Sequence, residues 1–211
     1  MDKQTTTILV TGATGLIGCA LVKELLTQPH AHVVALSRTA SKLHQLFRPY
    51  ADMGTFTCVP MDLSNPFDFS SILEKSNHSH FDSVFHAASP ISGTTIQQSP
   101  LDIIKPNLIA TQCLLDGLIK QHSETGIKGR ILIFSSATVY GQHKCANISA
   151  AGATTHVRAS ATTNASTVAN PNSSATRMTC DKDIIVQETD TMCAESLDSI
   201  FAPYSESKRM T

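Results

Sequence analysis

The sequence lacks any run of about 20 apolar residues, the length that a helix needs to cross a membrane. It also lacks a secretory signal, because its first seven residues are polar and the next apolar stretch is short and rich in glycine. The formal charge of −1 provides no strong field for DNA or an acidic membrane surface. Charged residues are few, at 16%, and apolar ones make up 41%. We therefore expect a soluble cytoplasmic protein without nucleic-acid or membrane partners.

Paired cysteine motifs are absent as well. The six cysteines lie far apart and none forms a CxxC pair. This spacing argues against a zinc site and favours free thiols in a reducing compartment, so we expect no metal.

Short apolar runs alternate with segments of helical period along the first 140 residues. The runs predict strands at 8–10, 33–36, 56–59, 83–86 and 130–134. This alternation is typical of an α/β fold of the Rossmann type, a doubly wound parallel sheet covered by helices on both faces. A chain of 211 residues has room for one such core, so we interpret 1–211 as a single domain.

Three helices are predicted in more detail. The first follows a glycine-rich turn and carries Ile17, Leu21 and Leu25 at four-residue spacing. The second spans 99–121, with Ser99 as N-cap and a kink or restart expected at Pro106. Its expected buried residues are Ile104, Leu108, Leu115 and Leu118. The third begins near Tyr204.

A stretch of low complexity interrupts the pattern. Ala, Ser, Thr and Asn supply 24 of the 31 residues from 146 to 176. With few large apolar side chains to bury, such a stretch cannot offset its ordering entropy. We expect a disordered surface insertion at about 145–180.

The segment Thr11–Gly18 reads TGATGLIG, which places Gly12, Gly15 and Gly18 between a strand and an amphipathic helix. Glycines let the backbone turn tightly and approach a pyrophosphate, and the helix N-terminus provides free N–H donors. The alternative is a purely structural turn. The strand-turn-helix context favours dinucleotide binding.

The residues after the second and third strands refine this prediction. Arg38 follows the second strand and Lys42 lies one helical turn later, where a cation suits a ribose 2′-phosphate. NADP is therefore favoured over NAD, although both side chains could be merely solvated. Asp62, after the third strand, is placed to reach an adenine amino group, or else begins a turn.

Tyr204 and Lys208 lie one helical turn apart in the sequence YSESK. A free tyrosine titrates near ~10, and a nearby cation favours its phenolate, which could then exchange a proton during hydride transfer. Alone, this pair is weak evidence, since a surface pair would look the same. Ser136 at the end of the fifth strand strengthens it, because a hydroxyl there could orient the reacting oxygen.

With these motifs in this order, the chain resembles the extended short-chain dehydrogenase/reductase family, which includes UDP-galactose 4-epimerase and sugar-nucleotide dehydratases. TGATGLIG, HAAS at 86–89, SSATVYG at 135–141 and PYSESKRM at 203–210 carry the resemblance. It implies Ser136, Tyr204 and Lys208 as catalytic residues. The implied cofactor-binding set is Gly12, Thr14, Gly15, Leu16, Ile17, Gly18, Arg38, Lys42, Asp62, Leu63, Ala87, Ala88, Ser89, Asn107, Tyr204 and Lys208.

The resemblance implies an NAD(P)-dependent oxidoreductase or epimerase that acts on a nucleotide sugar or a similar hydroxyl or keto compound, as a homodimer. Typical 4,6-dehydratases carry an Asp-Glu pair where this chain has Ala137-Thr138, which favours epimerisation or simple redox chemistry over water elimination. Relatives continue beyond the position of Thr211 into a substrate domain, which we expect to be missing here. The alternatives are a non-catalytic NADP-binding sensor and an inactive truncated fragment.

Overall fold

A computed structural model describes residues 5–90, 99, 101–136, 139 and 202–211 of the chain. Its centre is a five-stranded sheet in the order β3-β2-β1-β4-β5, and every neighbouring pair is parallel. The strands are β1 (Thr6–Thr11), β2 (Ala31–Ser37), β3 (Phe56–Pro60), β4 (Ser83–His86) and β5 (Arg130–Ile133). All five predicted strands are present, and the Rossmann-type fold is confirmed.

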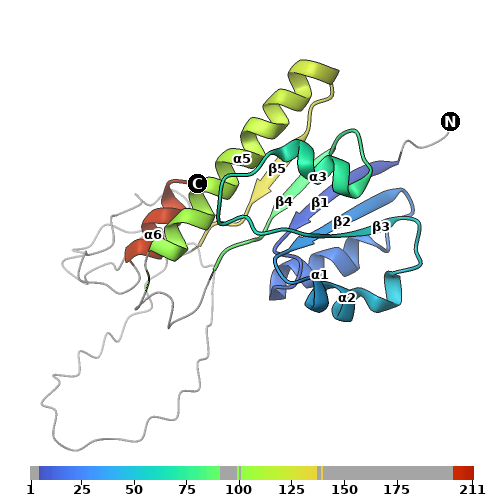
Figure 1. Ribbon diagram of the computed structural model, residues 1–211, viewed down its shortest axis with the longest axis horizontal. Helices are drawn as coiled ribbons and strands as arrows, with labels where there is room; N and C mark the ends of the chain where they lie inside the picture. Colours follow the sequence, from blue (N-terminus) through green and yellow to red (C-terminus); the bar gives the residue numbers. More distant parts are fainter. Residues whose placement is uncertain (1–4, 91–98, 100, 137–138, 140–201) are drawn as a thin grey trace, which may run out of the picture.

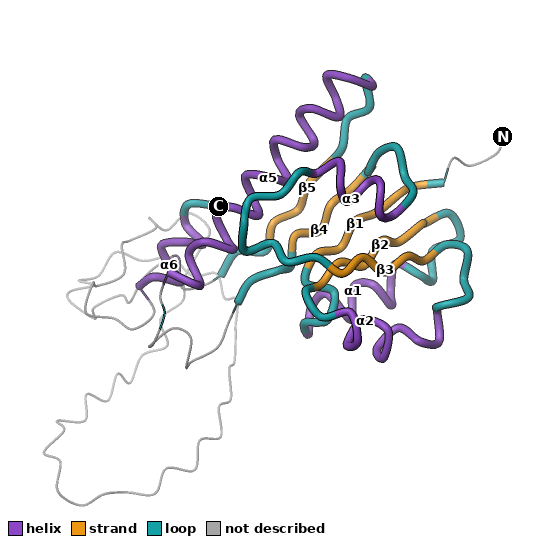
Figure 2. The backbone as a smooth tube through the Cα atoms, in the orientation of Figure 1, coloured by secondary structure: helices purple, strands orange, loops and turns teal. Residues whose placement is uncertain are grey.

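Helices cover both faces of the sheet (Figures 1 and 2). One face carries α1 (Leu16–Leu25), α2 (Ala40–Phe47) and the short 3-10 helix η1 (Arg48–Tyr50). The other carries α3 (Phe69–Ser76) and the long α5 (Leu101–Thr125). The last helix, α6 (Ala202–Arg209), packs on α5 and begins two residues before the position that the sequence predicted.

Because side chains alternate between the two faces of the sheet along each strand, the core has two parts, one on each face. Ile8 and Val10 of β1 pack with the α1 and α2 side chains, whereas Leu9 between them packs with α3 and α5. Because successive side chains of a strand point to opposite faces, the middle residues of a strand that is covered on both faces are mostly apolar. This explains why the predicted strands at 8–10 and 33–36 appear as continuous apolar runs.

The predicted apolar faces of α1 and α5 are only partly correct. In α1 the buried residues are Gly18 and Val22, Leu21 and Leu25 are half-buried against the core, and Ile17 is 53% exposed. In α5 Leu118 is buried as predicted, but Leu115 is exposed, and Ile104 and Leu108 are half-buried. The residues that α5 buries are Ile103, Asn107, Ala110, Thr111, Leu114, Gly117, Leu118 and Gln121. The helix runs unbroken through Pro106 instead of restarting there.

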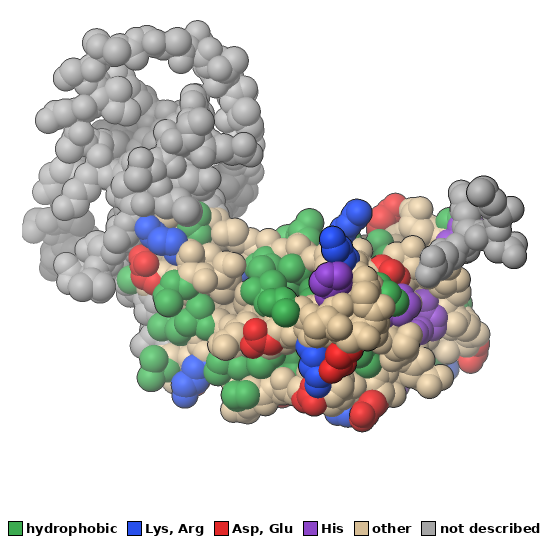
Figure 3. Space-filling model, turned by 90° about the horizontal axis from the view of Figure 1, so that it is seen from above, with side chains coloured by type: hydrophobic (Ala, Val, Ile, Leu, Met, Phe, Trp, Pro, Cys, Tyr) green, Lys and Arg blue, Asp and Glu red, His purple; other side chains and the backbone are tan. Residues whose placement is uncertain are grey.

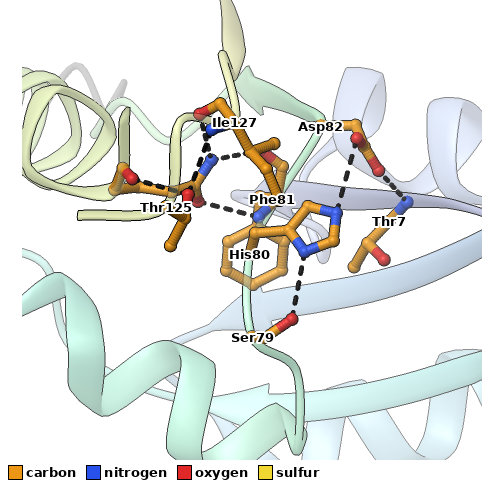
Figure 4. Close-up of polar contacts among 8 residues, drawn as sticks. Thr7, Ser79, His80, Phe81, Asp82, Thr125 and Ile127 are labelled. Atoms are coloured by element: carbon orange, nitrogen blue, oxygen red, sulfur yellow. Dashed lines mark hydrogen bonds and ion pairs between the residues drawn. The ribbon is translucent and has the colours of Figure 1, made fainter. Parts of the chain in front are cut away.

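A buried glutamine anchors the far end of α5 to the start of β4. Gln121 Oε1 accepts the Phe81 N–H at 2.9 Å, and its Nε2 donates to the Phe81 carbonyl at 3.0 Å. Beside it, the Thr7 N–H donates to Asp82 Oδ2 at 2.7 Å, and His80 Nε2 lies 3.6 Å from Asp82 Oδ1 (Figure 4). These contacts fix the amino edge of the sheet, opposite the edge where ligands bind in such folds.

The expected insertion at about 145–180 lies outside the described residues. No helix among the described residues is long and apolar enough to cross a membrane. On the face shown in Figure 3, acidic and basic side chains are interspersed over the described surface rather than gathered in a patch of one sign.

Candidate functional site

A cleft of about 760 Å³ opens at the carboxyl edge of the sheet. It lies where the strand order reverses, since β1 pairs with β2 on one side and β4 on the other. Open α/β sheets bind ligands at such a switch point. The lining residues are Gly12, Thr14, Gly15, Leu36, Ser37, Arg38, Lys42, Met61, Asp62, Leu63, Ser64, Asn65, Ala87, Ala88, Ser89, Pro90, Asp102, Lys105 and Pro106.

The floor of the cleft is the glycine turn between β1 and α1. Gly12 has φ +67°, and a Cβ there would lie 2.6 Å from the Ala88 nitrogen. A Cβ on Gly18 would lie 2.3 Å from the Gly12 carbonyl oxygen. The turn therefore nests against the segment after β4 and against α1, with no room for side chains at these two positions.

The N-terminus of α1 faces this turn without a side-chain cap. Gly15 is the N-cap residue, is exposed, and has no side chain to bond the first-turn amides. The first N–H groups of a helix have no partner within the helix and carry the positive end of its dipole. A phosphate is the ligand that such an arrangement favours.

A hydrogen-bond network joins the glycine turn to the segment after β4. Thr11 Oγ1 lies 2.8 Å from His86 Nδ1 and accepts the Ala88 N–H at 3.2 Å. Thr11 and His86 are paired in register as the last residues of their strands. The two segments that would hold opposite sides of a dinucleotide are thus fixed to each other.

His86 connects this network to α6 electrostatically. It is 1% exposed, and burial, followed by repulsion from Lys208, lowers the pKa of its imidazole to about 4. Lys208 is itself 5% exposed, and its Nζ donates to the Phe134 carbonyl at 2.9 Å. Burial lowers the pKa of this ammonium below its usual value. With a neutral imidazole, His86 adds no second positive charge near the buried Lys208.

The predicted cations line the side of the cleft that is formed by the segments after β2 and β3. Arg38 and Lys42 are exposed and line it, next to a hydroxyl pair in which Thr14 Oγ1 and Ser37 Oγ lie 2.7 Å apart. Asp62 is exposed and accepts the Ser64 N–H at 3.0 Å, which is the turn geometry that the sequence left open as an alternative. Its second carboxylate oxygen has no hydrogen bond within the described residues.

None of the three predicted catalytic residues, Ser136, Tyr204 and Lys208, lines the cleft. Tyr204 on α6 is 8% exposed and packs on Ile103 of α5. Lys208 reaches Phe134, two residues before Ser136 on the chain. Of the predicted cofactor ligands, Leu16, Ile17, Gly18 and Asn107 also lie outside the lining. Asn107 is 1% exposed and donates from Nδ2 to Ser207 Oγ at 2.8 Å.

Several residues that line the cleft were not predicted from the sequence. Ser64 and Asn65 lie beyond Asp62 after β3, and Asp102, Lys105 and Pro106 lie in the first turns of α5. The order of the elements was the available signal, because the start of each helix must lie at the carboxyl edge of the strand before it. Taken together, the cleft offers the groups that a dinucleotide would need: a turn without side chains beside uncapped helix amides, two cationic side chains, and a carboxylate with one oxygen unbonded within the described residues.

Comparisons with known proteins agree with this fit. A sequence model described as the NAD dependent epimerase/dehydratase family matches residues 8–162. An uncharacterized oxidoreductase of Saccharomyces cerevisiae is 29% identical over 133 residues, 63% of this chain and 37% of that protein. UDP-glucuronic acid decarboxylase 6 of Arabidopsis thaliana is 28% identical over 134 residues, 64% of this chain and 34% of that protein.

The solved structure of the UDP-Glc/GlcNAc 4-epimerase from Campylobacter jejuni superimposes with a TM-score of 0.58 at 21% identity. The superposition covers 97% of this chain and 46% of that one. At this identity the likeness concerns the fold. The matched region of this chain spans less than half the length of each of these relatives.

Proposed function

Because the chain belongs to the NAD dependent epimerase/dehydratase family, we propose that it binds a nicotinamide dinucleotide in the cleft and uses it for hydride transfer on a nucleotide sugar or a similar hydroxyl or keto compound. The observation that carries this proposal is the glycine turn. Gly12 and Gly18 have no room for a Cβ, and the N-terminus of α1, which follows the turn, has no side-chain cap.

The proposal assigns a part of the cofactor to each lining segment of the cleft. The amides around Gly15 would hold the pyrophosphate, and Asp62 with Leu63 the adenine. Arg38 and Lys42 would hold a 2′-phosphate, which favours NADP over NAD. The lining segment Ala87–Ser89 would lie beneath the nicotinamide half. The remaining predicted cofactor-binding residues would contribute to cofactor binding from just outside the lining: Leu16, Ile17, Gly18 and Asn107.

The bound nicotinamide would supply the hydride acceptor or donor. In the oxidising direction, the substrate C–H bond gives up a hydride and the substrate O–H proton passes to Tyr204 Oη. Lys208, as an ammonium, would favour the phenolate and hold the ribose hydroxyls of the nicotinamide. Ser136 would donate a hydrogen bond to the reacting oxygen and so orient it.

We further propose that 1–211 acts as one nucleotide-binding domain. Within it, the three proposed catalytic residues stand outside the lining of the cleft. This observation favours, as a second candidate, a non-catalytic module that senses or sequesters NADP. Both candidate functions bind the cofactor in the same cleft, but only the first transfers a hydride to or from a substrate.

A tyrosine exchange separates the two candidates. Tyr204→Phe removes the phenolic oxygen, so turnover of a UDP- or dTDP-sugar should fall at least about 100-fold while NADPH binding changes little. Tyr50→Phe is the matched control, because Tyr50 ends η1 and does not line the cleft. Turnover that survives Tyr204→Phe contradicts the catalytic assignment. Tight NADPH binding without turnover of any sugar nucleotide favours the sensor.

A further inference from the structure

Ser207, the residue before Lys208, makes two hydrogen bonds, one that joins α6 to α5 and one within α6. Its Oγ accepts from Asn107 Nδ2 at 2.8 Å and donates to the Tyr204 carbonyl at 2.7 Å. A hydroxyl has one proton to give and can accept in return, so both bonds form at the same time. Within α5, Thr111 Oγ1 donates to the backbone carbonyl of Asn107 at 2.7 Å, so the Asn107 side chain is held on α6 by the bond to Ser207 alone among the described residues.

Water cannot replace these bonds, since Ser207 and Asn107 are each 1% exposed. If the serine hydroxyl were removed, the Asn107 amide would remain buried with a donor unpaired. A buried donor without a partner costs more than the hydrogen bond itself contributes. We call the group Asn107, Ser207 and the Tyr204 carbonyl the α5–α6 clamp.

The clamp lies beside the apolar contact that seats the tyrosine. Tyr204, at 8% exposed, packs on Ile103, which is fully buried and one helical turn before Asn107. The α6 helix has eight residues, and an isolated helix of that length is not stable in water. Its position therefore depends on contacts with the rest of the fold, chiefly with α5.

We propose that Ser207 is a positioning residue that docks α6 on α5 and thereby sets Tyr204 and Lys208 at the carboxyl edge of the sheet. The docking itself stands on the contacts above. Its consequence for the cofactor rests on the proposed function, since it requires Lys208 and Tyr204 to hold the nicotinamide ribose. Ser207 does not line the cleft, so any effect on cofactor affinity must act through its neighbours.

The same helix provides a matched control. Ser205 is 0% exposed, and its Oγ has no hydrogen-bond partner within the described part of the chain. Ser205→Ala and Ser207→Ala therefore delete the same atom from two buried positions of one helix. The first removes an unbonded hydroxyl, whereas the second breaks the clamp.

The docking is tested by hydrogen–deuterium exchange of the peptide covering α6 in the full chain. Ser207→Ala should speed exchange at least about tenfold, while Ser205→Ala should leave it within about twofold of the original chain. Asn107→Ala should match Ser207→Ala, and the double variant should exchange no faster than either, because all three break one clamp. Equal exchange in Ser207→Ala and Ser205→Ala would overturn the docking. If Ser207→Ala does not fold, Asn107→Leu/Ser207→Ala removes both partners and should restore the fold; failure to do so also counts against the clamp.

The consequence for the cofactor is tested by titrating the same variants with NADH. Ser207→Ala should raise the NADH Kd at least about fivefold, and Ser205→Ala by less than twofold. If Ser207→Ala speeds exchange but leaves the NADH Kd unchanged, the positioning role is wrong, although the docking of α6 on α5 by Ser207 still holds. Absence of NADH and NADPH binding to the unsubstituted chain would refute the proposed function instead, and the exchange comparison would still decide the docking.

Discussion

Thr11 and His86 meet side by side at the carboxyl edge of the sheet, with Thr11 Oγ1 2.8 Å from His86 Nδ1. The hydroxyl also accepts the Ala88 N–H, so its single proton is free to be donated to an unprotonated Nδ1. A neutral His86 thus completes the bonds that hold the glycine turn against the segment after β4. A second proton on the imidazole would break this pattern and place a cation near Lys208.

The first prediction concerns pH. The pKa of His86 falls from an ordinary 6.5 to about 4 on folding, so the unfolded chain binds the extra proton between these values. Stability should be fully present above pH 6.5 and decrease as the pH falls toward 4, by about 3 kcal/mol in total. His86→Asn, which keeps a polar partner for Thr11 but cannot take up this proton, should flatten that part of the profile. Urea unfolding at a series of pH values measures it, and an equally steep profile in the variant contradicts the assignment.

The second prediction concerns the turn. Gly12→Ala places a Cβ 2.6 Å from the Ala88 nitrogen at a φ of +67°, and should cost at least about 2 kcal/mol of unfolding free energy. Gly54→Ala is the control, because a Cβ there meets nothing within 4 Å, and should change stability by less than about 0.5 kcal/mol. Thermal unfolding compares the two. Similar losses in both would mean that the turn does not nest against the segment after β4.

The third prediction concerns the opposite edge of the sheet. Gln121→Leu keeps the size of the side chain but leaves the N–H and carbonyl of Phe81 without their partner, and should cost about 2–4 kcal/mol. Gln112→Leu on the exposed side of the same helix should cost little. Chemical denaturation distinguishes them. Because this anchor lies at the amino edge, NADPH affinity of the folded Gln121→Leu protein should be unchanged, and a large loss would be unexpected.

The fourth prediction concerns cofactor choice. Arg38→Ala should raise the Kd for NADPH at least about tenfold and that for NADH by less than about threefold, because only NADPH carries the 2′-phosphate. Arg48→Ala removes another exposed guanidinium, one that does not line the cleft, and should change neither Kd. Equal losses for the two cofactors in Arg38→Ala would refute the NADP preference.

The strands and the glycine turn could be predicted because their signals are local. The middle of a strand that is covered on both faces is a run of apolar residues, as at 8–10 of β1 and 33–36 of β2, and the glycines at 12 and 18 fill positions that no other residue fits. The buried faces of the helices could not be predicted this way. Asn107 and Gln121 point inward because they find hydrogen-bond partners 100 and 40 positions away. Apolar spacing alone does not contain that information.

The lining of the cleft was predicted where residues directly follow a strand. It was missed further along the segment after β3, at Ser64 and Asn65, and in the first turns of α5. Arg38, Asp62 and Ala88 line the cleft because each follows a strand end. Lys105 lines it because α5 returns to the same edge, which depends on how α5 packs rather than on any motif. The coupling of Ser207 to Asn107 is a contact of the same kind.

The central claim is that the bare amides at the start of α1 bind the phosphates of a nicotinamide dinucleotide. The most direct test is a fluorescence titration with NADPH of the unsubstituted chain, Gly15→Ala and Gly15→Asp. Gly15 is exposed with an ordinary φ of −78°, so both variants should fold, and the alanine controls for size. We predict saturable binding to the unsubstituted chain, modest weakening by alanine, and loss of about 100-fold or more with aspartate, whose charge repels the phosphates. An equal NADPH Kd in Gly15→Asp and the unsubstituted chain, or no saturable binding to the unsubstituted chain, would contradict the account.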